Sequence, residues 1–238
     1  MKDDEEISSL HKNVYKLEND IENLYLKNLL SFAYRAMSIY YINSIKRDGI
    51  DIFQLKEIFN EILSMFYLEG DKVFGFKISE KWNVGVYLFN EDIGVLQSVW
   101  RHRANGHPST GLGRDWLPGE GHVGKAFLDR RPILTGNAND EAVAQLCRAR
   151  NSKQLPYDSS AYISFASVPI AISGKEEENP FGVLVVTSDQ EGRFYEESTT
   201  ELLMHAAETL ALIFELSDID MSCLLSPNHN IVKNEQGD

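Results

Sequence analysis

Arginine is concentrated in one segment of the chain. Residues 101–153 contain seven of the ten arginines, and their net charge is +4, whereas the rest of the chain sums to −17. The basic residues of this segment are Arg101, Arg103, Arg114, Lys125, Arg130, Arg131, Arg148, Arg150 and Lys153. A guanidinium group suits bidentate recognition of a carboxylate or phosphate. Two interpretations stay open: the arginines bind a small anionic ligand, or they pair with acidic groups elsewhere and solvate the surface.

Other residues of this region could also do chemistry, but their spacing indicates no catalytic arrangement. His102, His107 and His122 match no standard metal-site spacing. Cys147 ends a helix-like Ala-Val-Ala-Gln-Leu-Cys run, which favours a small buried side chain over a covalent or redox role. Spacing supports no Ser-His-Asp or paired-carboxylate site, so we predict that the protein is not an enzyme.

Two tryptophans flank the start of this basic region. Trp100 and Trp116 serve either as anchors of the core or as surfaces on which a ligand ring stacks. Three nearby glycines, Gly119, Gly121 and Gly124, allow a sharp turn and a close approach of a helix. They match neither GxGxxG nor a P-loop, so a phosphate cradle of that type is not supported.

The overall composition limits the classes of protein that fit. The chain has 238 residues, 43% hydrophobic and 25% charged, which is typical of a globular protein. A net charge of −13 disfavours a nucleic-acid partner, because an acidic surface repels the phosphate backbone. Cys147 and Cys223 are too few for a disulfide framework. The acidic start is unlike a signal peptide, and the most apolar stretch, 24–45, is interrupted by charges, so we predict a cytoplasmic protein without a membrane span.

A heptad pattern marks the N-terminal region. Apolar residues recur at a 3-4-3-4-3 spacing, at Ile7, Leu10, Val14, Leu17, Ile21 and Leu24. After Leu24 the pattern changes phase in a way that resembles a stutter. We predict one long helix over residues 5–47 that pairs with another helix and makes the protein a homodimer. The alternative is an amphipathic helix lying on its own domain.

The remaining periodicity predicts helices and strands in alternation. A second helix over 52–68 begins after the cap Asp51, and a final helix covers 197–216. Between them we expect helices over 121–129 and 140–150 and strands over 73–78, 84–89, 94–102, 132–135, 161–172 and 181–188. Strands in the middle with helices around them indicate an α+β fold. The expected domains are a coiled-coil-like helix (1–48), one α+β domain (49–217) and a mobile tail (218–238).

Three motifs give the chain a family resemblance. Residues 116–127 read WLPGEGHVGKAF and are followed by Arg131-Pro132-Ile133, residues 164–170 read SFASVPI, and residues 181–188 read FGVLVVTS. These segments resemble the "PGEGxxGxA", "(R/K)P", "S-x-x-x-VPI" and "GVLxxxS" motifs of GAF domains. The resemblance covers about residues 52–216. It implies a PAS-like antiparallel sheet flanked by helices, with a ligand cavity between the sheet and the middle loops and helices.

Three sequence differences separate this chain from GAF classes with a known ligand or reaction, and they limit which ligands the resemblance implies. Asn139-Asp140-Glu141 lacks the partners of the cyclic-nucleotide signature, and Cys147 is followed by Arg148 rather than by the His of bilin-binding GAF domains. The sulfoxide-reducing GAF enzymes use several cysteines around the cavity, whereas only Cys147 falls inside this domain. Most GAF domains are not enzymes, and they bind small molecules or dimerise within signalling proteins.

These observations together predict a cytoplasmic, non-catalytic sensor. It would bind a small ligand of unknown identity, with an anion as the candidate class, and signal through helix-mediated dimerisation to a separate output protein, with no metal site and no assignable cofactor. The candidate ligand-binding residues are Trp100, Arg101, Arg103, Arg114, Trp116, His122, Arg131, Cys147 and Ser164, with Arg101 and Arg131 favoured among the arginines. The alternatives are a ligand-free interaction scaffold and a small redox enzyme that uses Cys147.

Overall fold

The structure is a computed structural model of the chain. It describes residues 2–109, 111, 113–147, 149, 153–175, 177–194, 197–219 and 222–225, with the backbone alone described at 2–6, 197, 198 and 222.

Two long helices precede the sheet, as the sequence predicts. α1 (Lys2–Asp48) is one unbroken helix of 47 residues, and α2 (Ile52–Leu68) follows after a short turn at Gly49. Asp51 caps α2: its carboxylate accepts hydrogen bonds from the Phe53 and Gln54 amides, and the Gln54 side chain accepts one from the Asp51 amide. This capping box satisfies amides that the helix itself leaves unpaired.

The centre of the domain is a five-stranded antiparallel sheet in the order β2-β1-β5-β4-β3. Its strands are β1 (Asn83–Asn90), β2 (Val95–Arg103), β3 (Ile133–Thr135), β4 (Ser164–Ile170) and β5 (Gly182–Ser188). The pairing of β1 with β2 shifts register between Val86 and Tyr87, so Val86 lies opposite Trp100 and Tyr87 opposite Ser98. The α+β fold expected from the sequence is therefore confirmed.

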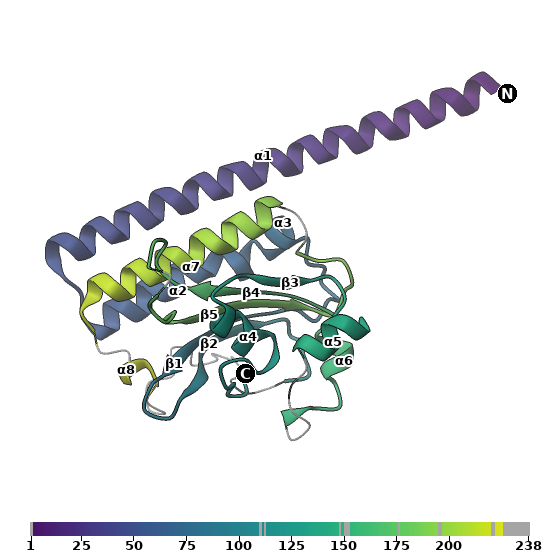
Figure 1. The fold of residues 1–238 in the computed structure, drawn as a ribbon. Coiled ribbons are helices and arrows are strands. Elements are labelled where there is room, and N and C mark those ends of the chain that lie inside the picture. The colour runs from purple at the N-terminus through teal and green to yellow at the C-terminus, as the bar shows by residue number, and fades with distance from the viewer. Residues whose placement is uncertain are drawn as a thin grey trace, which may run out of the picture.

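Helices cover both faces of the sheet and form three layers (Figure 1). α2, α7 (Glu197–Ser217) and the second half of α1 lie on one side, and α7 separates α1 from the sheet. The shorter helices α4 (Gly121–Asp129), α5 (Glu141–Cys147) and α6 (Asp158–Ala161) lie on the other side. A ligand site on the second side is thus separated from the long helices by the sheet.

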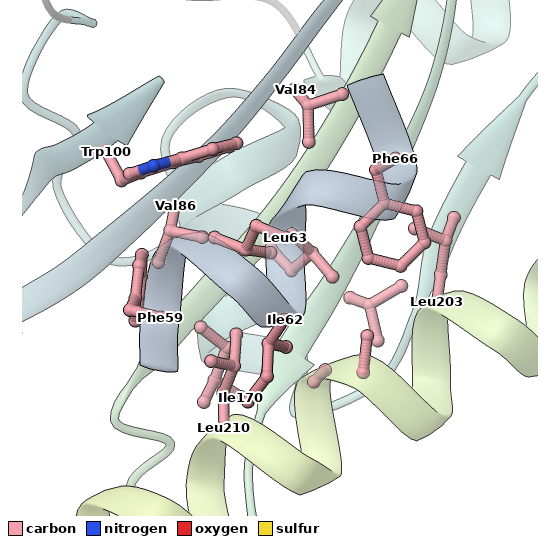
Figure 2. Packing of buried hydrophobic residues seen from close by; sticks show 14 of the residues in the cluster. Phe59, Ile62, Leu63, Phe66, Val84, Val86, Trp100, Ile170, Leu203 and Leu210 are labelled. Carbon is pink, nitrogen blue, oxygen red and sulfur yellow. The ribbon is translucent and has the colours of Figure 1, made fainter. Parts of the chain in front are cut away.

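Two hydrophobic clusters hold these layers together. The larger one fills the space between the sheet and α2, α7 and α1, where Phe59, Ile62, Leu63 and Phe66 of α2 pack against the sheet (Figure 2). The smaller one lies under α4 and includes Tyr87, Trp116 and Phe127. Since side chains alternate along a strand, the same strands feed both clusters.

One predicted element differs from the structure. The expected strand over 73–78 is absent, because Gly70–Phe74 forms the short helix α3, from which Phe74 packs against Phe66 and Phe194. Within the predicted mobile tail, which starts at 218, the structure has α8 (Ser222–Leu225), whose Leu224 is buried in the larger cluster. Residues 220, 221 and 226–238 of that tail lie outside the described residues.

Candidate functional site

A pocket of about 270 Å³ opens on the α4 side of the sheet. Its floor comes from the sheet, with Arg101 on β2, Asn83 on β1 and Thr187 on β5. A neighbouring pocket of about 350 Å³ extends toward α5 and α6. The two pockets share Arg114, Trp116, His122, Leu155 and Tyr162. They therefore adjoin each other and are treated as one site, bounded by the sheet, α4 and α6.

Arg101 is buried at the floor of this site, with 8% of its surface exposed. Its guanidinium donates hydrogen bonds to the Asn83 Oδ1, to the Ser109 Oγ at 2.8 Å, to the Gly111 carbonyl at 3.2 Å and to the Tyr162 hydroxyl at 3.2 Å. All four acceptors are neutral, and no acidic side chain in the described part of the chain forms an ion pair with Arg101. Among the described residues, Arg101 is thus a buried positive charge with hydrogen-bond partners but no ion-pair partner of its own.

Two neighbours pack beside Arg101 and its hydrogen-bond partners. Gly85 lies opposite Arg101 on β1, and a Cβ at Gly85 would be in ordinary van der Waals contact with the Arg101 Cγ at 3.8 Å. The Nδ1 of buried His107 accepts a hydrogen bond from the Ser109 amide at 3.1 Å, which positions the Ser109 hydroxyl. Desolvation, then the charges of Arg101 and Arg103, lower the pKa of His107 to about 4, so this histidine is neutral near pH 7.

Most other basic side chains of the arginine-rich segment have acidic partners. Arg114 pairs with Asp158 at 2.7 Å, Lys125 with Asp129 at 3.1 Å and Lys153 with Glu120 at 2.9 Å. For these residues, the interpretation that charges pair with acidic groups holds. Arg148 and Arg150 fall outside the described residues. Arg101 differs from the paired residues because its partners carry no charge.

Arg114 and Trp116 form one wall of the site. The Arg114 guanidinium lies 5.0 Å from the Trp116 ring centroid and 6.0 Å from that of Tyr162, distances suited to cation–π attraction. Its ion pair with Asp158 of α6 fixes this wall to the opposite rim. Trp116 is buried, and its backbone pairs with Leu96 as an isolated bridge beside the edge strand β2.

His122 and Cys147 complete the lining toward α4 and α5. The His122 ring stacks on Phe165 at 4.1 Å, and its Nδ1 lies 2.6 Å from the Ser167 Oγ. Desolvation first, then the charge of Arg114, lower the pKa of His122 to about 3. Cys147 lines the second pocket, and burial raises the pKa of its thiol. Both side chains are therefore neutral near pH 7.

Four predicted site residues lie outside the two pockets. Trp100 faces the opposite side of the sheet, where its Nε1 donates to the Asn60 Oδ1 at 2.7 Å and its ring packs against Phe59. It is adjacent to Arg101, and consecutive strand residues point to opposite faces. Arg131 is exposed in the turn after α4, 3.6 Å from the Asp129 carboxylate. Neither residue reaches the site.

Arg103 and Ser164 also lie away from the pocket lining. The Arg103 guanidinium donates to the Gly111 carbonyl at 2.8 Å and stabilises the same loop that contacts Arg101. The Ser164 hydroxyl is fully buried and donates to the Gln190 carbonyl at 2.7 Å, which ties β4 to the loop after β5. Of the predicted site residues, the structure therefore brings together Arg101, Arg114, Trp116, His122 and Cys147.

Sequence reasoning missed several residues that line this site. Tyr162 lies between α6 and β4 and contacts both Arg101 and the second pocket, while Asn83, Thr187 and Tyr157 line the first. Asn83 and Thr187 face each other across β1 and β5, so only knowledge of how these strands pair could have identified them.

Two other kinds of feature are absent from the described residues. Among the residues that the structure describes, no group of three or more His, Cys, Asp or Glu side chains could hold a metal ion. In that same part of the chain, none of the helices combines the length and the apolar character needed to cross a membrane.

Comparison with known proteins identifies the family of this chain and structures of similar fold. The sequence model of a family described as GAF domain matches residues 77–215, more than half of the chain. The free methionine-R-sulfoxide reductase of Neisseria meningitidis, solved with its substrate, is 20% identical with a TM-score of 0.51, over 79% of this chain and 91% of that chain. This likeness is one of fold.

Two other solved structures give lower scores. The fRMsr of Staphylococcus aureus, in complex with substrate, is 17% identical with a TM-score of 0.47, over 76% of this chain and 94% of that chain. The GAF domain of a phosphoenolpyruvate-protein phosphotransferase from Acinetobacter is 14% identical with a TM-score of 0.48, over 78% and 95%. No curated protein matches this chain.

Proposed function

Because this chain belongs to the GAF domain family, we propose that it is a non-catalytic sensor module that binds a small anionic ligand at Arg101. Binding is passed to a separate output protein through a dimer formed by the N-terminal helix. The ligand would favour one of two packings of the long helices, which requires that it bind the two packings with different affinity.

The observation that supports an anionic ligand is the environment of Arg101. A buried arginine, here with 8% of its surface exposed, is costly without a counter-charge, and hydrogen bonds to neutral groups offset only part of this cost. A carboxylate or phosphate in the adjoining 270 Å³ pocket supplies the missing charge. The pocket volume also favours ligand binding over the alternative of a scaffold whose cavity is filled by its own side chains.

The test is a binding experiment on matched arginine variants. Isothermal titration with acetate, inorganic phosphate and larger carboxylates that fit the pocket identifies a probe that the parent protein binds. Arg101→Gln should weaken that binding about ten- to a hundredfold, since a charge-assisted hydrogen bond contributes roughly 1.5–3 kcal/mol. Arg131→Gln removes an exposed arginine outside the pocket and should bind as the parent does.

The two variants separate the possible outcomes. Equal affinities of Arg101→Gln and the parent protein would refute the anion site at Arg101. Absence of binding for every anion tested, combined with native mass spectra that show no co-purified small molecule, would favour the ligand-free scaffold instead.

Signalling through α1 rests on the exposed heptad residues of its first half. Leu17→Asp with Leu24→Asp would bury two unpaired carboxylates in a helix pair and should yield a monomer in light scattering. The control Asn19→Asp with Asn23→Asp adds the same two charges outside the a and d positions of the heptad and should remain dimeric. A double Leu variant that stays dimeric would exclude this seam.

Two features support a role without catalysis. The pKa of the Cys147 thiol is raised by burial, which reduces the thiolate fraction that nucleophilic or redox chemistry needs. His122 is held neutral and bonded to Ser167. If the protein reduces free methionine sulfoxide, as the Neisseria relative's name describes, Cys147→Ser should abolish the activity, and a measurable Cys147-dependent turnover would overturn this proposal.

A further inference from the structure

The first half of α1 exposes a stripe of large apolar side chains. Its six residues, at the 3-4-3-4-3 spacing, have 48–61% of their surface exposed, and they are Ile7, Leu10, Val14, Leu17, Ile21 and Leu24. Figure 1 shows this half of the helix extending past the end of α7 and beyond the sheet. A stripe of this length and regularity marks a surface that another helix covers.

The residue types within the stripe differ between the a and d positions of the heptad. Ile7, Val14 and Ile21 occupy the a positions of the heptad and are all β-branched. All three d positions are leucine. In a parallel coiled coil, β-branched residues at a with leucine at d favour two strands over three or four. The a and d residues of α1 are therefore those expected of a parallel pair of helices.

The residues that flank the stripe are compatible with a parallel pair in register. In that arrangement, each g position faces the e position of the following heptad on the second helix. Asn13 then lies opposite Glu18 of the second copy, and Asp20 lies opposite Tyr25 of the second copy. Neither of these two pairs places like charges opposite each other, although the segment contains several carboxylates.

The second half of α1 continues the apolar surface while it packs on its own domain. Tyr34 is buried against the ring of His205 of α7, and Ser38 accepts a hydrogen bond from the Thr209 hydroxyl of α7 at 3.2 Å. Tyr25, Phe32 and Ile39, spaced by seven residues, remain 60–71% exposed. α1 can thus contact α7 on one face and another helix on a different face at the same time.

We propose that residues 7–24 of α1 bind the same residues of a second copy of this chain as a parallel, in-register, two-stranded coiled coil. This inference rests on the helix-mediated dimer of the proposed function and defines its orientation. Leu10 then meets Leu10 of the second copy, and both α+β domains lie at the same end of the coiled coil. An antiparallel pair of the same segments, 7–24, would instead place Leu10 opposite Ile21 of the second copy.

Disulfide trapping in the full chain tests this orientation. In a Cys147→Ser, Cys223→Ser background, Leu10→Cys places one thiol at a d position near the end of the segment. A parallel pair brings the two thiols within disulfide range, whereas an antiparallel pair separates them by 11 residues, about 16 Å along the helix. Asn19→Cys, at an outward f position, is the matched control. Mild oxidation should convert most of the Leu10→Cys protein, and little of the control, to a cross-linked dimer.

The other outcomes each have a distinct meaning. Cross-linking that needs a mixture of Leu10→Cys and Ile21→Cys chains would establish antiparallel pairing and overturn the inference, while the helix-mediated dimer would stand. A monomer in light scattering would overturn both, and would leave the anion site to be decided by the Arg101→Gln titration. Equal cross-linking of Leu10→Cys and Asn19→Cys would also overturn the inference, because it would show that the helices meet at random and not through a defined coiled-coil contact.

Discussion

The Tyr162 hydroxyl accepts a hydrogen bond from the Arg101 guanidinium at 3.2 Å. This contact joins the segment between α6 and β4 to strand β2 across the pocket. It also leaves the arginine with a neutral partner at a position where a carboxylate would cancel its charge. The geometry of the guanidinium is thus fixed while its charge stays available.

We predict that Tyr162→Phe weakens anion binding through the loss of this orientation. One neutral hydrogen bond contributes about 1 kcal/mol, so the dissociation constant for the best probe anion should rise about fivefold. Tyr157→Phe is the control, because Tyr157 lines the same pocket and the structure shows no hydrogen bond between it and Arg101. Titration calorimetry on both variants measures the effect, and equal affinities for the two would contradict it.

A pH dependence should follow from His122. The pKa of His122 is about 3 in the folded chain, lowered by desolvation and by Arg114, whereas an unfolded histidine has a pKa near 6.5. Between these values the unfolded state binds more protons, so the stability present above pH 6.5 is lost as the pH falls toward 3. Melting temperatures should therefore decrease from pH 7 to pH 5.

His122→Phe should make that decrease smaller, because phenylalanine keeps the stacking on Phe165 but cannot take up a proton. His11→Gln, which removes an exposed histidine of α1, should retain the slope of the parent protein. A parental slope in His122→Phe would show that this residue does not contribute. His107, with a pKa of about 4, should account for part of the slope that remains.

Glu80 forms a buried ion pair that should be costly to break. Its carboxylate accepts from Arg193 at 2.6 Å and from the Ser188 hydroxyl, with only 1% of its side chain exposed. Glu80→Gln leaves Arg193 without its counter-charge and should lower the free energy of unfolding in urea by about 3 kcal/mol. Glu178→Gln breaks an exposed pair with Lys175 and should cost less than about 1 kcal/mol. Similar losses for both variants would contradict the importance of burial.

Gly124 should tolerate no side chain. A Cβ at this position would collide with the Leu117 carbonyl oxygen, because the first turn of α4 lies directly against the preceding loop. Gly124→Ala should lower the free energy of unfolding by about 3 kcal/mol through overpacking. Gly106→Ala meets no atom within 4 Å and should change it by less than about 0.5 kcal/mol. Comparable midpoints of the two variants in urea would contradict the close approach.

The elements with strong periodicity could be predicted from the sequence. The heptads of α1, the Asp51 cap of α2 and the glycine-rich start of α4 are local signals, and the structure has these elements where they were expected. The segment 73–78 shows the limit of this approach. A short apolar run suits a strand or a buried helix equally well, and here aromatic packing around Phe74 decides for a helix.

The site could be predicted only in part, because it depends on which face of the sheet each residue occupies. β2 is buried on both faces around Trp100 and Arg101, so its sequence lacks the alternation that would have shown their opposite directions. The bulge next to Val86 changes the register further. Arg131 lies at the entrance of β3 as expected, but its side chain is exposed and lies 3.6 Å from the Asp129 carboxylate instead of reaching the pocket. Tertiary contacts decide which strand residues face the pocket.

The length of α1 has a geometric consequence. Its 47 residues span about 70 Å, whereas the contacts with α7 lie in its second half, around Tyr34 and Ser38. From Tyr34 to Ile7 the helix extends ~40 Å, so a tilt of ~5° at α7 would displace Ile7 by ~3.5 Å. With this geometry, a rearrangement too small to disrupt the packing on α7 would become a displacement at the far end comparable to the size of a side chain.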